Sequence, residues 1–254
     1  MTAIEYRDVC KGFPGSGTLA VDHVSAKIED GELIAILGSS GCGKTTLLKL
    51  TNRLYEPDSG SILLFGENVA RRDPVTLRRG IGYVIQQVGL FPHMTVEENI
   101  GAIPKLMKWS KSKIAERVTE LLTLVGLDPE VFRCRYPSQL SGGQQQRIGL
   151  ARALALDPKV MLLDEPFGAI DAITRLNLQK ELLRLHAGLG KTFLLVTHDI
   201  NEAFRLGDRV MIMNEGKLLQ FDTSKNIVRH PADLFVETLI RSAREQEVFR
   251  EAVT

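Results

Sequence analysis

The chain has 254 residues, of which 44% are hydrophobic and 25% charged, and its formal net charge is +1. A chain of this length and apolar content can bury a full hydrophobic core. So small a net charge creates no strong field to attract nucleic acid or an anionic membrane surface, and no nucleic-acid partner is expected.

The three cysteines, Cys10, Cys42 and Cys134, are widely spaced and form no C-x-x-C pair. This spacing is atypical of a zinc site or a disulfide framework and fits a reducing compartment. The segment Met1–Cys10 lacks the basic start and apolar run of a signal peptide. No apolar stretch approaches the roughly 20 residues of a transmembrane helix. We therefore expect a cytosolic protein unless a partner holds it at a membrane.

Alternating apolar residues at the N-terminus predict strands of a half-exposed antiparallel sheet. These residues are Ile4, Tyr6, Val21, Val24, Ala26 and Ile28. Leu33–Leu37 is a continuous apolar run, typical of a strand covered on both faces. It leads into the glycine-rich Gly38–Gly43 and then into a helical pattern through Leu54 that ends before Pro57. Asp58–Gly60 predicts a turn before a strand at Ile62–Phe65.

From about Phe91 to Pro158 the pattern is mainly helical. One predicted helix ends at Gly126, and a second begins at Ser141 and ends near Asp157-Pro158. The later elements are strands at Val160–Leu163 and Phe193–Val196, a helix over about Ala172–Leu189, and a hairpin at Asn214–Gly216 between Val210–Met213 and Lys217–Phe221. Strand–helix alternation predicts an α/β core with a largely parallel sheet, interrupted by a helical insertion.

The segment Gly38–Thr45 reads GSSGCGKT and matches G-x-x-x-x-G-K-[ST] between a buried strand and a helix. Glycines let successive backbone N–H groups point at phosphate oxygens, and the helix N-terminus favours negative charge. Lys44 is expected to reach the β- and γ-phosphates, and the Thr45 hydroxyl to ligate Mg²⁺. The alternative, a flexible glycine turn before an ordinary helix, does not explain the strand–loop–helix context. Cys42 is interpreted as a small filler of the loop.

Two carboxylates, Asp164 and Glu165, follow the apolar run Val160–Leu163. Burying them at a strand end is costly without cations. In a nucleotide site Asp164 can hold the Mg²⁺ shell, while Glu165 can orient and polarise the attacking water. The alternative is a helix or turn cap that begins at Asp164.

The segment Leu140–Gln144 reads LSGGQ. Ser141 and Gln144 have capping-box spacing, which a well-capped helix would explain. Gly142 and Gly143 nevertheless lower helix propensity in the first turn, and they would expose N–H groups to an anion. In a two-fold dimer, each chain could close this second phosphate-binding surface over the nucleotide of the other.

These motifs, in this order, resemble the nucleotide-binding subunit of an ABC transporter over essentially the whole chain. Gly38–Thr45 resembles the Walker A loop, Leu140–Gln144 the signature, and Met161–Pro166 Walker B. The resemblance implies an ABC-type P-loop NTPase fold with a RecA-like core, an N-terminal antiparallel β-subdomain and an inserted helical subdomain. It implies a nucleotide-binding domain over residues 1–240, a helical subdomain over about 91–158, and a short charged tail over 241–254.

The resemblance also implies roles for individual residues, with ATP and Mg²⁺ bound. Glu165, His198 and Gln86 would be catalytic, and Thr45, Gln86 and Asp164 would hold the metal. Phe13 resembles the aromatic that stacks on adenine, although a lone aromatic in a strand is more often core, and Ala169–Asp171 resembles the D-loop. The implied nucleotide contacts are Phe13, Gly38, Ser39, Ser40, Gly41, Cys42, Gly43, Lys44, Thr45, Thr46, Ser141, Gly142, Gly143, Gln144 and Asp171.

The stretch Ile81–Val96 resembles the osmoprotectant branch of the family, which imports glycine betaine, choline, carnitine and related quaternary amines. Asn52–Leu54, Trp109–Lys111 and Asp171–Arg175 agree with that branch. The implied function is an ATPase that powers such an importer; the alternative is an importer of amino acids or another small organic solute. A non-transport ABC ATPase would need a coiled-coil insertion, zinc cysteines or a second cassette. Many members of that branch carry paired CBS domains after the ATPase domain, and a chain of 254 residues is not expected to contain them.

The resemblance implies three kinds of partner. They are a second copy joined through ATP, an integral membrane permease gripped near Phe91-Pro92, and, indirectly, an extracytoplasmic solute-binding protein. The chain would lie peripherally at the cytoplasmic face of a prokaryotic inner membrane.

Overall fold

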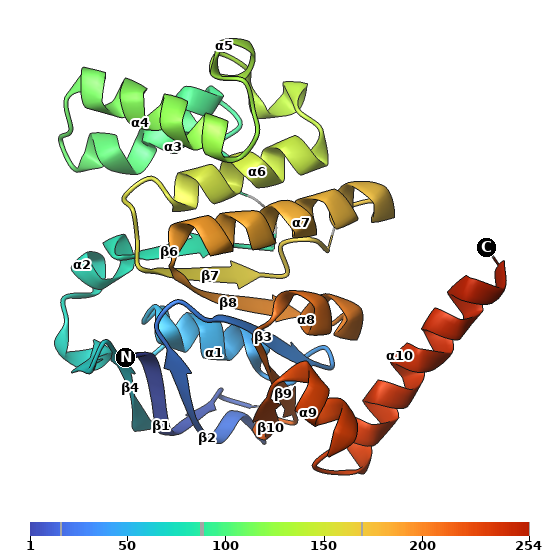
Figure 1. Ribbon diagram of the computed structural model, residues 1–254. Helices are drawn as coiled ribbons and strands as arrows, with labels where there is room; N and C mark the ends of the chain where they lie inside the picture. The colour runs from blue at the N-terminus through green and yellow to red at the C-terminus, as the bar shows by residue number, and fades with distance from the viewer. Residues whose placement is uncertain (16, 87–88, 169, 254) are drawn as a thin grey trace. The chain divides into compact units, whose positions relative to one another are not determined.

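The computed structural model describes residues 1–15, 17–86, 89–168 and 170–253, with side chains described as far as residue 243. The chain divides into two compact units (Figure 1). The first unit comprises Met1–Leu77 and Thr192–Thr254, and the second comprises Arg78–Lys191.

The first unit contains the predicted antiparallel sheet, in the strand order β2-β1-β4-β5. Its strands are β1 (Thr2–Gly12), β2 (Leu19–Glu29), β4 (Ser59–Leu64) and β5 (Glu67–Asn68). Along β2, the buried residues Val21, Val24 and Ile28 are separated by exposed or half-buried ones, which confirms the expected half-exposed sheet.

A second group of strands in the first unit is built around β3 (Leu33–Gly38). It pairs in parallel with β8 (Thr192–Thr197) and β9 (Arg209–Asn214), and β10 (Lys217–Asp222) pairs antiparallel with β9. Every residue of β3 and β8 is buried, as predicted for strands covered on both faces. The phosphate loop therefore starts from a fully buried strand.

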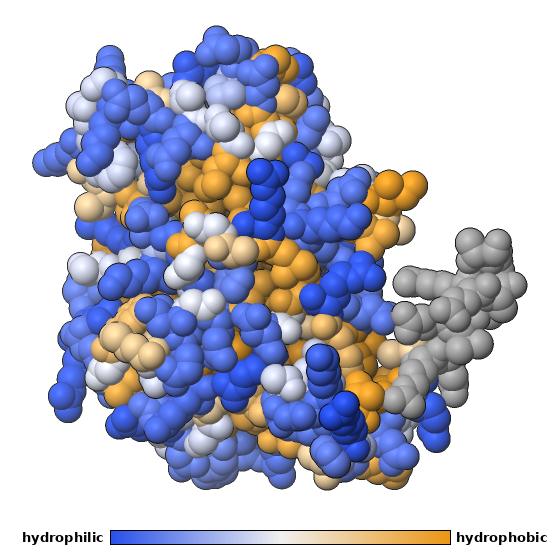
Figure 2. Space-filling view, viewed as in Figure 1, coloured by the Kyte–Doolittle hydropathy of each residue, from blue (hydrophilic) through white to orange (hydrophobic). Residues whose placement is uncertain are grey.

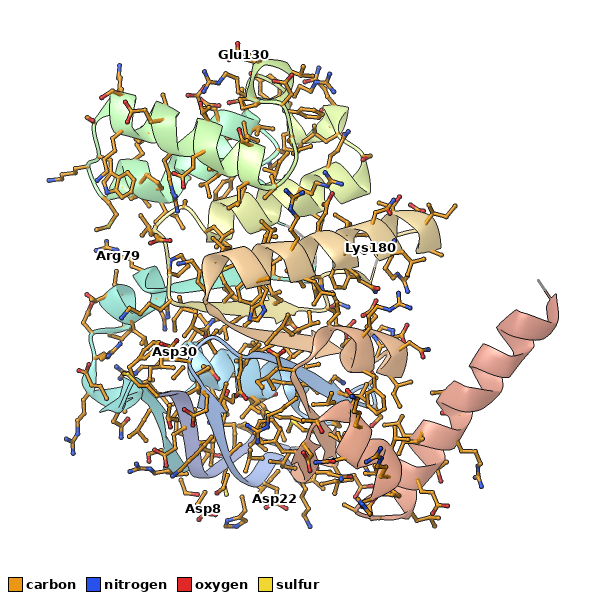
Figure 3. All side chains as sticks on the ribbon, viewed as in Figure 1. Asp8, Asp22, Asp30, Arg79, Glu130 and Lys180 are labelled. Atoms are coloured by element: carbon orange, nitrogen blue, oxygen red, sulfur yellow. The ribbon has the colours of Figure 1, made fainter. Side chains whose placement is uncertain are left out.

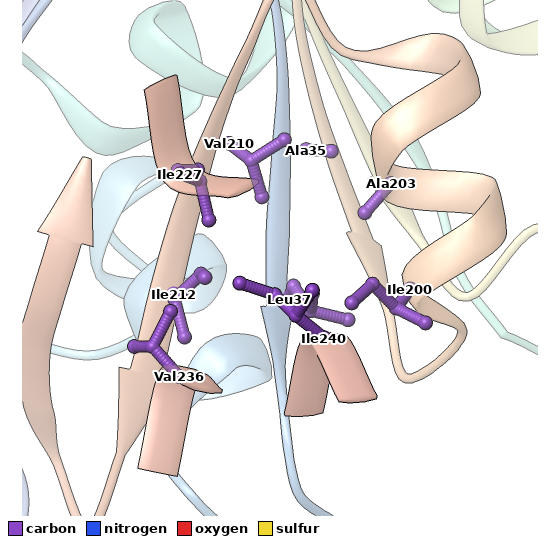
Figure 4. Packing of buried hydrophobic residues seen from close by; sticks show 9 residues of the cluster. All are labelled: Ala35, Leu37, Ile200, Ala203, Val210, Ile212, Ile227, Val236 and Ile240. Carbon is purple, nitrogen blue, oxygen red and sulfur yellow. The ribbon is translucent and has the colours of Figure 1, made fainter. Parts of the chain in front are cut away.

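Three helices of the first unit share one hydrophobic cluster with these strands (Figure 4). They are α8 (Ile200–Leu206), α9 (Ser224–Arg229) and α10 (Leu234–Val253). Leu37 of β3 and Ile212 of β9 lie in this cluster with Ile227 and Val236. The predicted charged tail, residues 241–254, follows Ile240 of the cluster, and its residues up to Val253 belong to α10.

The second unit contains the parallel pair β6 (Ile81–Val84) and β7 (Val160–Asp164). Its helices are α3 (Val96–Leu106), α4 (Lys111–Leu124), α5 (Pro129–Phe132), α6 (Gly142–Ala153) and α7 (Ala172–Leu189). The region between about residues 91 and 158 is helical as predicted, and Gly126 follows α4 at φ 68°. The bounds of α7 are those predicted.

Two helices end earlier than predicted. Helix α1 (Lys44–Thr51) stops before Leu54, which is 46% exposed, because Arg53 takes the left-handed conformation at φ 55°. Helix α6 ends at Ala153 rather than near Asp157-Pro158. The guanidinium of Arg117, in α4, donates to the carbonyls of Leu154 and Ala155 just beyond the end of α6. These two carbonyls therefore accept hydrogen bonds from a side chain and do not need the N–H groups of a further helical turn.

Among the described residues, no helix combines the length and apolar character needed to cross a membrane. Hydrophilic side chains cover much of the face shown in Figure 2.

Candidate functional site

The phosphate loop joins β3 to α1, so the strand–loop–helix context predicted from the sequence is confirmed. A Cβ at Gly38 would overlap the carbonyl oxygen of Met213 in β9. A Cβ at Gly43, where φ is 103°, would overlap the carbonyl oxygen of Ala20 in β2. Glycine is therefore required at both ends of the loop by close backbone approach.

Lys44 folds its side chain back across the loop and is only 5% exposed. Its Nζ donates to the carbonyl oxygens of Gly38 (2.8 Å) and Ser39 (2.7 Å). The Sγ of Cys42 lies 3.8 Å from the same ammonium and is buried, which agrees with its interpretation as a filler. The backbone of the loop thus surrounds the Lys44 ammonium.

No acidic side chain in the first turn of α1 competes with a bound anion for the backbone N–H groups there. Its N-cap is Gly43, which supplies no side-chain acceptor, and no acidic residue lies in the first turn. Thr45 and Thr46 are half-buried there, whereas Ser39, Ser40 and Gly41 are exposed. Such a helix start attracts an anion through its dipole and its N–H groups.

Gly216, at the tip of the β9–β10 hairpin, links the loop to the antiparallel sheet. Its N–H donates to the carbonyl of Cys42 (3.1 Å), and its own carbonyl accepts the N–H of Asp22 in β2 (2.9 Å). Its φ of 82° suits glycine.

Phe13 follows the end of β1 and is 36% exposed rather than part of the core. Its ring meets that of Tyr55 edge-on, with centroids 5.2 Å apart. The ammonium of Lys11 lies 5.7 Å from the Phe13 centroid. Phe13 therefore belongs to a partly exposed aromatic and cationic cluster of the first unit.

His198 is exposed and follows the buried strand β8. The residues on either side of it, Thr197 and Asp199, are held by hydrogen bonds. Thr197 Oγ1 donates to Glu202 Oε2 (2.6 Å) and accepts the N–H of Asp199 (3.0 Å), and Glu202 is 7% exposed. Asp199 in turn accepts the N–H groups of Asn201 and Glu202 at the start of α8. This network fixes the backbone that presents His198.

The acidic pair lies in the second unit at the end of β7. Asp164 is 6% exposed, and its Oδ2 accepts a long bond from the Tyr83 hydroxyl (3.4 Å). Glu165 has φ 45°, so the chain turns sharply after Asp164. The two carboxylates therefore extend from the backbone in different directions. Gln86 Nε2 donates to Glu165 Oε2 at 2.9 Å. The fold therefore brings together Gln86 and Glu165, two residues that lie far apart in the sequence.

The LSGGQ segment forms the predicted capping box at the start of α6. Ser141 Oγ accepts the N–H of Gln144 (3.3 Å), and Gln144 Oε1 accepts the N–H of Ser141 (3.0 Å). The two glycines differ in their surroundings. A Cβ at Gly142 would meet nothing within 4 Å, but one at Gly143 would lie 2.7 Å from Thr174 Cγ2 in α7. Gly142 leaves the helix start open, while Gly143 permits close packing of two helices.

Asp171 caps α7 and accepts the N–H of Thr174 at 3.0 Å. This backbone hydrogen bond holds the pKa of the Asp171 carboxyl below its usual value. Ile170 accepts a hydrogen bond from Arg175 Nη2 through its carbonyl (2.9 Å). Of the predicted D-loop, Ala169 lies outside the described residues, as do Gln87 and Val88 of the stretch Ile81–Val96.

The sequence analysis did not single out Tyr83, Thr197 or Glu202, although each touches or supports a candidate residue. Asp199 and Glu202 stand three residues apart before an apolar helix, a spacing that could have indicated a capped helix next to His198. Tyr83 carries no such signal, since only the pairing of β6 with β7 brings it to Asp164.

Residues 21–168 match the family model described as ABC transporter. The choline transport ATP-binding protein OpuBA of Bacillus subtilis is 53% identical over 93% of this chain and 62% of its own length. The carnitine transport ATP-binding protein OpuCA of Listeria monocytogenes is 52% identical over 95% of this chain and 60% of its own. The glycine betaine uptake system ATP-binding protein YehX of Escherichia coli is 47% identical over 92% of this chain and 75% of its own length. The chain thus spans less than two thirds of the first two relatives.

Two solved structures share the fold. One, titled a dimeric post-hydrolysis state of the ATP-binding cassette MJ0796 bound to ADP and Pi, matches at TM-score 0.76 and 33% identity, covering 87% of this chain and 98% of the other. The second is cbiO1 of Clostridium perfringens, part of the transporter complex cbiONQ, at TM-score 0.83 and 28% identity over 98% and 99% of the two chains. Together, the matched family model, the relatives and the fold show that this chain belongs to the ABC transporter family, as an ATP-binding cassette with an ABC-type P-loop NTPase fold.

Proposed function

We propose that this chain binds and hydrolyses ATP to power a membrane importer of osmoprotectants, quaternary amines such as glycine betaine, choline or carnitine. The observation that carries the ATPase proposal is the 2.9 Å hydrogen bond between Gln86 and Glu165. It holds the expected general base at the end of the strand that supplies Asp164. The solute class rests on the names of OpuBA, OpuCA and YehX.

In the proposed reaction, the loop Gly38–Thr45 and the start of α1 bind the phosphates through backbone N–H groups, and Lys44 neutralises charge on the β- and γ-phosphates. Glu165 accepts the proton of the attacking water, and Gln86 positions the Glu165 carboxylate. His198 contacts the γ-phosphate from the segment held by Thr197. Phe13 stacks on adenine.

The proposed metal ligands are oxygen donors, which suit Mg²⁺: the Thr45 hydroxyl, the Asp164 carboxylate and the Gln86 side-chain amide. Gln86 uses Nε2 for its bond to Glu165, so Oε1 is the atom that a cation would contact. When bound, Mg²⁺ would neutralise negative charge on the transferred phosphoryl group.

The proposed domain arrangement follows the family motifs. Residues 1–240 form the nucleotide-binding domain, with the helical subdomain over about 91–158 and the tail over 241–254. In a two-fold dimer, Ser141–Gln144 and Asp171 of one copy close over the nucleotide of the other. The dimeric MJ0796 structure supports this assembly.

The proposed membrane partner is a permease, contacted by the segment through Phe91-Pro92. The chain then lies peripherally at the cytoplasmic face of a prokaryotic inner membrane. An extracytoplasmic binding protein delivers the solute to that permease.

The ATPase proposal is tested by Glu165→Gln. We expect ATP binding to persist and turnover to fall about 10²–10⁴-fold, the usual contribution of a positioned general base. ATP affinity and phosphate release are measured on the purified chain, with Glu130→Gln, an exposed glutamate of α5, as the matched control. Wild-type turnover in Glu165→Gln would remove Glu165 from its assigned role.

The solute proposal needs its own test, since sulfate/thiosulfate import ATP-binding proteins match this chain almost as well as YehX, at 46% identity. The chain is reconstituted with its permease and binding protein in vesicles. ATP-driven uptake of choline, glycine betaine and carnitine is compared with uptake of sulfate and amino acids. Uptake of sulfate or amino acids without uptake of a quaternary amine would refute the osmoprotectant assignment.

A further inference from the structure

We propose that the first unit carries a divalent-metal site, suited to zinc, formed by Cys10 of β1 with Asp22 and His23 of β2. The thiol, carboxylate and imidazole donor atoms of these residues all lie within 4.8 Å of one another. This site is separate from the proposed Mg²⁺ ligands and does not depend on the proposed transport function.

Two bulges create the cluster. The pairing of β1 with β2 shifts register between Tyr6 and Val9 and again between Val9 and Lys11. Asp8 and His23 take the left-handed conformation there, at φ 52° and 51°. Bulges redirect side chains and are common at functional sites. The backbone N–H of His23 donates to Cys10 Sγ at 3.3 Å, which places the sulfur beside the histidine.

A carboxylate from outside the cluster orients the imidazole. His23 Nδ1 lies 2.8 Å from Asp8 Oδ1, and a carboxylate acceptor requires Nδ1 to carry the proton. In the neutral ring, Nε2 then presents its lone pair, and it lies 3.9 Å from Asp22 Oδ1. The order carboxylate, histidine, metal is the usual outer-shell arrangement of zinc-binding histidines. Figure 3 labels Asp8 of β1 and Asp22 of β2, the two neighbouring strands that carry the cluster.

A shared ion would draw the three donors closer together. In a tetrahedral site, zinc bonds of about 2.0–2.2 Å place a nitrogen and an oxygen donor roughly 3.4 Å apart. The His23 and Asp22 donors, now 3.9 Å apart, therefore need to approach each other by about half an ångström. A bond of about 2.3 Å to sulfur places the sulfur roughly 3.6 Å from each of the other two donors. The Cys10 thiol, which lies within 4.8 Å of them, therefore closes in by up to about an ångström when the ion binds. Sulfur, nitrogen and oxygen donors together select zinc or a similar thiophilic cation over Mg²⁺, with a fourth position for water.

Asp22 is held in place for this role. Its backbone N–H is bound by the carbonyl of Gly216, and its Oδ2 lies 3.6 Å from the ammonium of Lys217, while Oδ1 faces His23. The ammonium of Lys217 reduces the attraction of the site for a cation. Removing that charge should therefore strengthen metal binding.

The test is a titration of the metal-free full-length chain, without nucleotide, by calorimetry with Zn²⁺ and by absorption with Co²⁺. We expect one equivalent per chain and a sulfur-to-cobalt charge-transfer band. His23→Gln and Asp22→Asn should weaken binding at least tenfold, Asp8→Asn about 10–100-fold, and Lys217→Met should tighten it. Cys134→Ser, an exposed cysteine, and Asp164→Asn, a proposed Mg²⁺ ligand, are the controls and should leave the affinity unchanged.

The proposal is overturned if His23→Gln and Asp22→Asn bind Zn²⁺ as tightly as the parent chain, or if the charge-transfer band is missing. Loss of binding in Asp164→Asn would also overturn it, because the ion would then occupy the other site. Cys10 is buried and Cys10→Ser could disturb folding, whereas the side chain of His23 is 66% exposed. The decision therefore rests on His23→Gln, with circular dichroism to verify its fold.

Discussion

The hydroxyl of Thr197 has two partners at the end of β8, the carboxylate of Glu202 and the backbone N–H of Asp199. Because Thr197 and Asp199 flank His198 directly, these bonds restrict the backbone on both sides of the exposed imidazole. A residue that must meet a γ-phosphate benefits from such support, since positioning supplies much of phosphoryl-transfer catalysis.

Thr197→Val should therefore destabilise the fold and slow ATP turnover. Removing a hydrogen bond to a charged group costs about 1.5–3 kcal/mol of unfolding free energy, measurable by urea denaturation. Thr197→Ser keeps the hydroxyl and serves as the control. An equal loss of stability in both variants would show that the methyl group, and not the hydrogen bond, matters at this position.

At the scale of elements, the start of α6 combines a capping box with two glycines that have different surroundings. Gly142 is exposed with open space around it, whereas Gly143 is buried against Thr174 of α7. Only the second glycine is needed for packing. The first is the one that leaves backbone N–H groups accessible, as the sequence-based hypothesis of a phosphate-binding surface requires.

Alanine substitutions separate the two roles. Gly142→Ala should leave unfolding free energy unchanged or raise it by up to about 1 kcal/mol, because alanine has the higher helix propensity. Gly143→Ala should lower it by about 1–3 kcal/mol, because the new methyl group overpacks against Thr174. Urea unfolding of the two variants side by side measures the difference. Equal effects would contradict the packing role of Gly143.

At the scale of the whole molecule, the proposed ATP-bridged dimer predicts a specific defect. In a Glu165→Gln background, ATP should convert the chain to a dimer, and Ser141→Arg should prevent this while ATP still binds. The bulky cation replaces a small side chain at the surface that closes over the partner's nucleotide. Light scattering with size exclusion measures the mass, and Ser112→Arg, at an exposed serine of α4, is the control. A Ser141→Arg chain that still dimerises with ATP would remove the LSGGQ segment from the interface.

Much of the fold could be predicted because its signals are local. The apolar run Leu33–Leu37, the bounds of α7 and the capping box at Ser141 each depend on residues near one another in sequence. The motif residues of the candidate site were found for the same reason: their spacing repeats a family pattern. Their catalytic roles stay predictions.

The features that sequence reasoning missed depend on long-range packing. Helix α6 ends early where Arg117 of a different helix binds the next carbonyls. Tyr83 reaches Asp164 only through the pairing of two strands distant in sequence. Bulged strand pairing places His23 beside Cys10, a neighbour that the spacing of the cysteines does not reveal. No short-range pattern encodes such neighbours.

The tip of the β9–β10 hairpin connects the phosphate loop to the antiparallel sheet, so a movement of the loop on nucleotide binding would be transmitted to the sheet. The N–H of Gly216 donates to the phosphate loop and its carbonyl accepts a hydrogen bond from β2, so a single residue of the hairpin links both. A displacement of the loop when phosphate enters must be followed by Asp22 or break a hydrogen bond. The backbone positions of Cys42 and Asp22 are therefore coupled. An ion bound by Asp22 would change how easily the phosphate loop is displaced when its ligand binds.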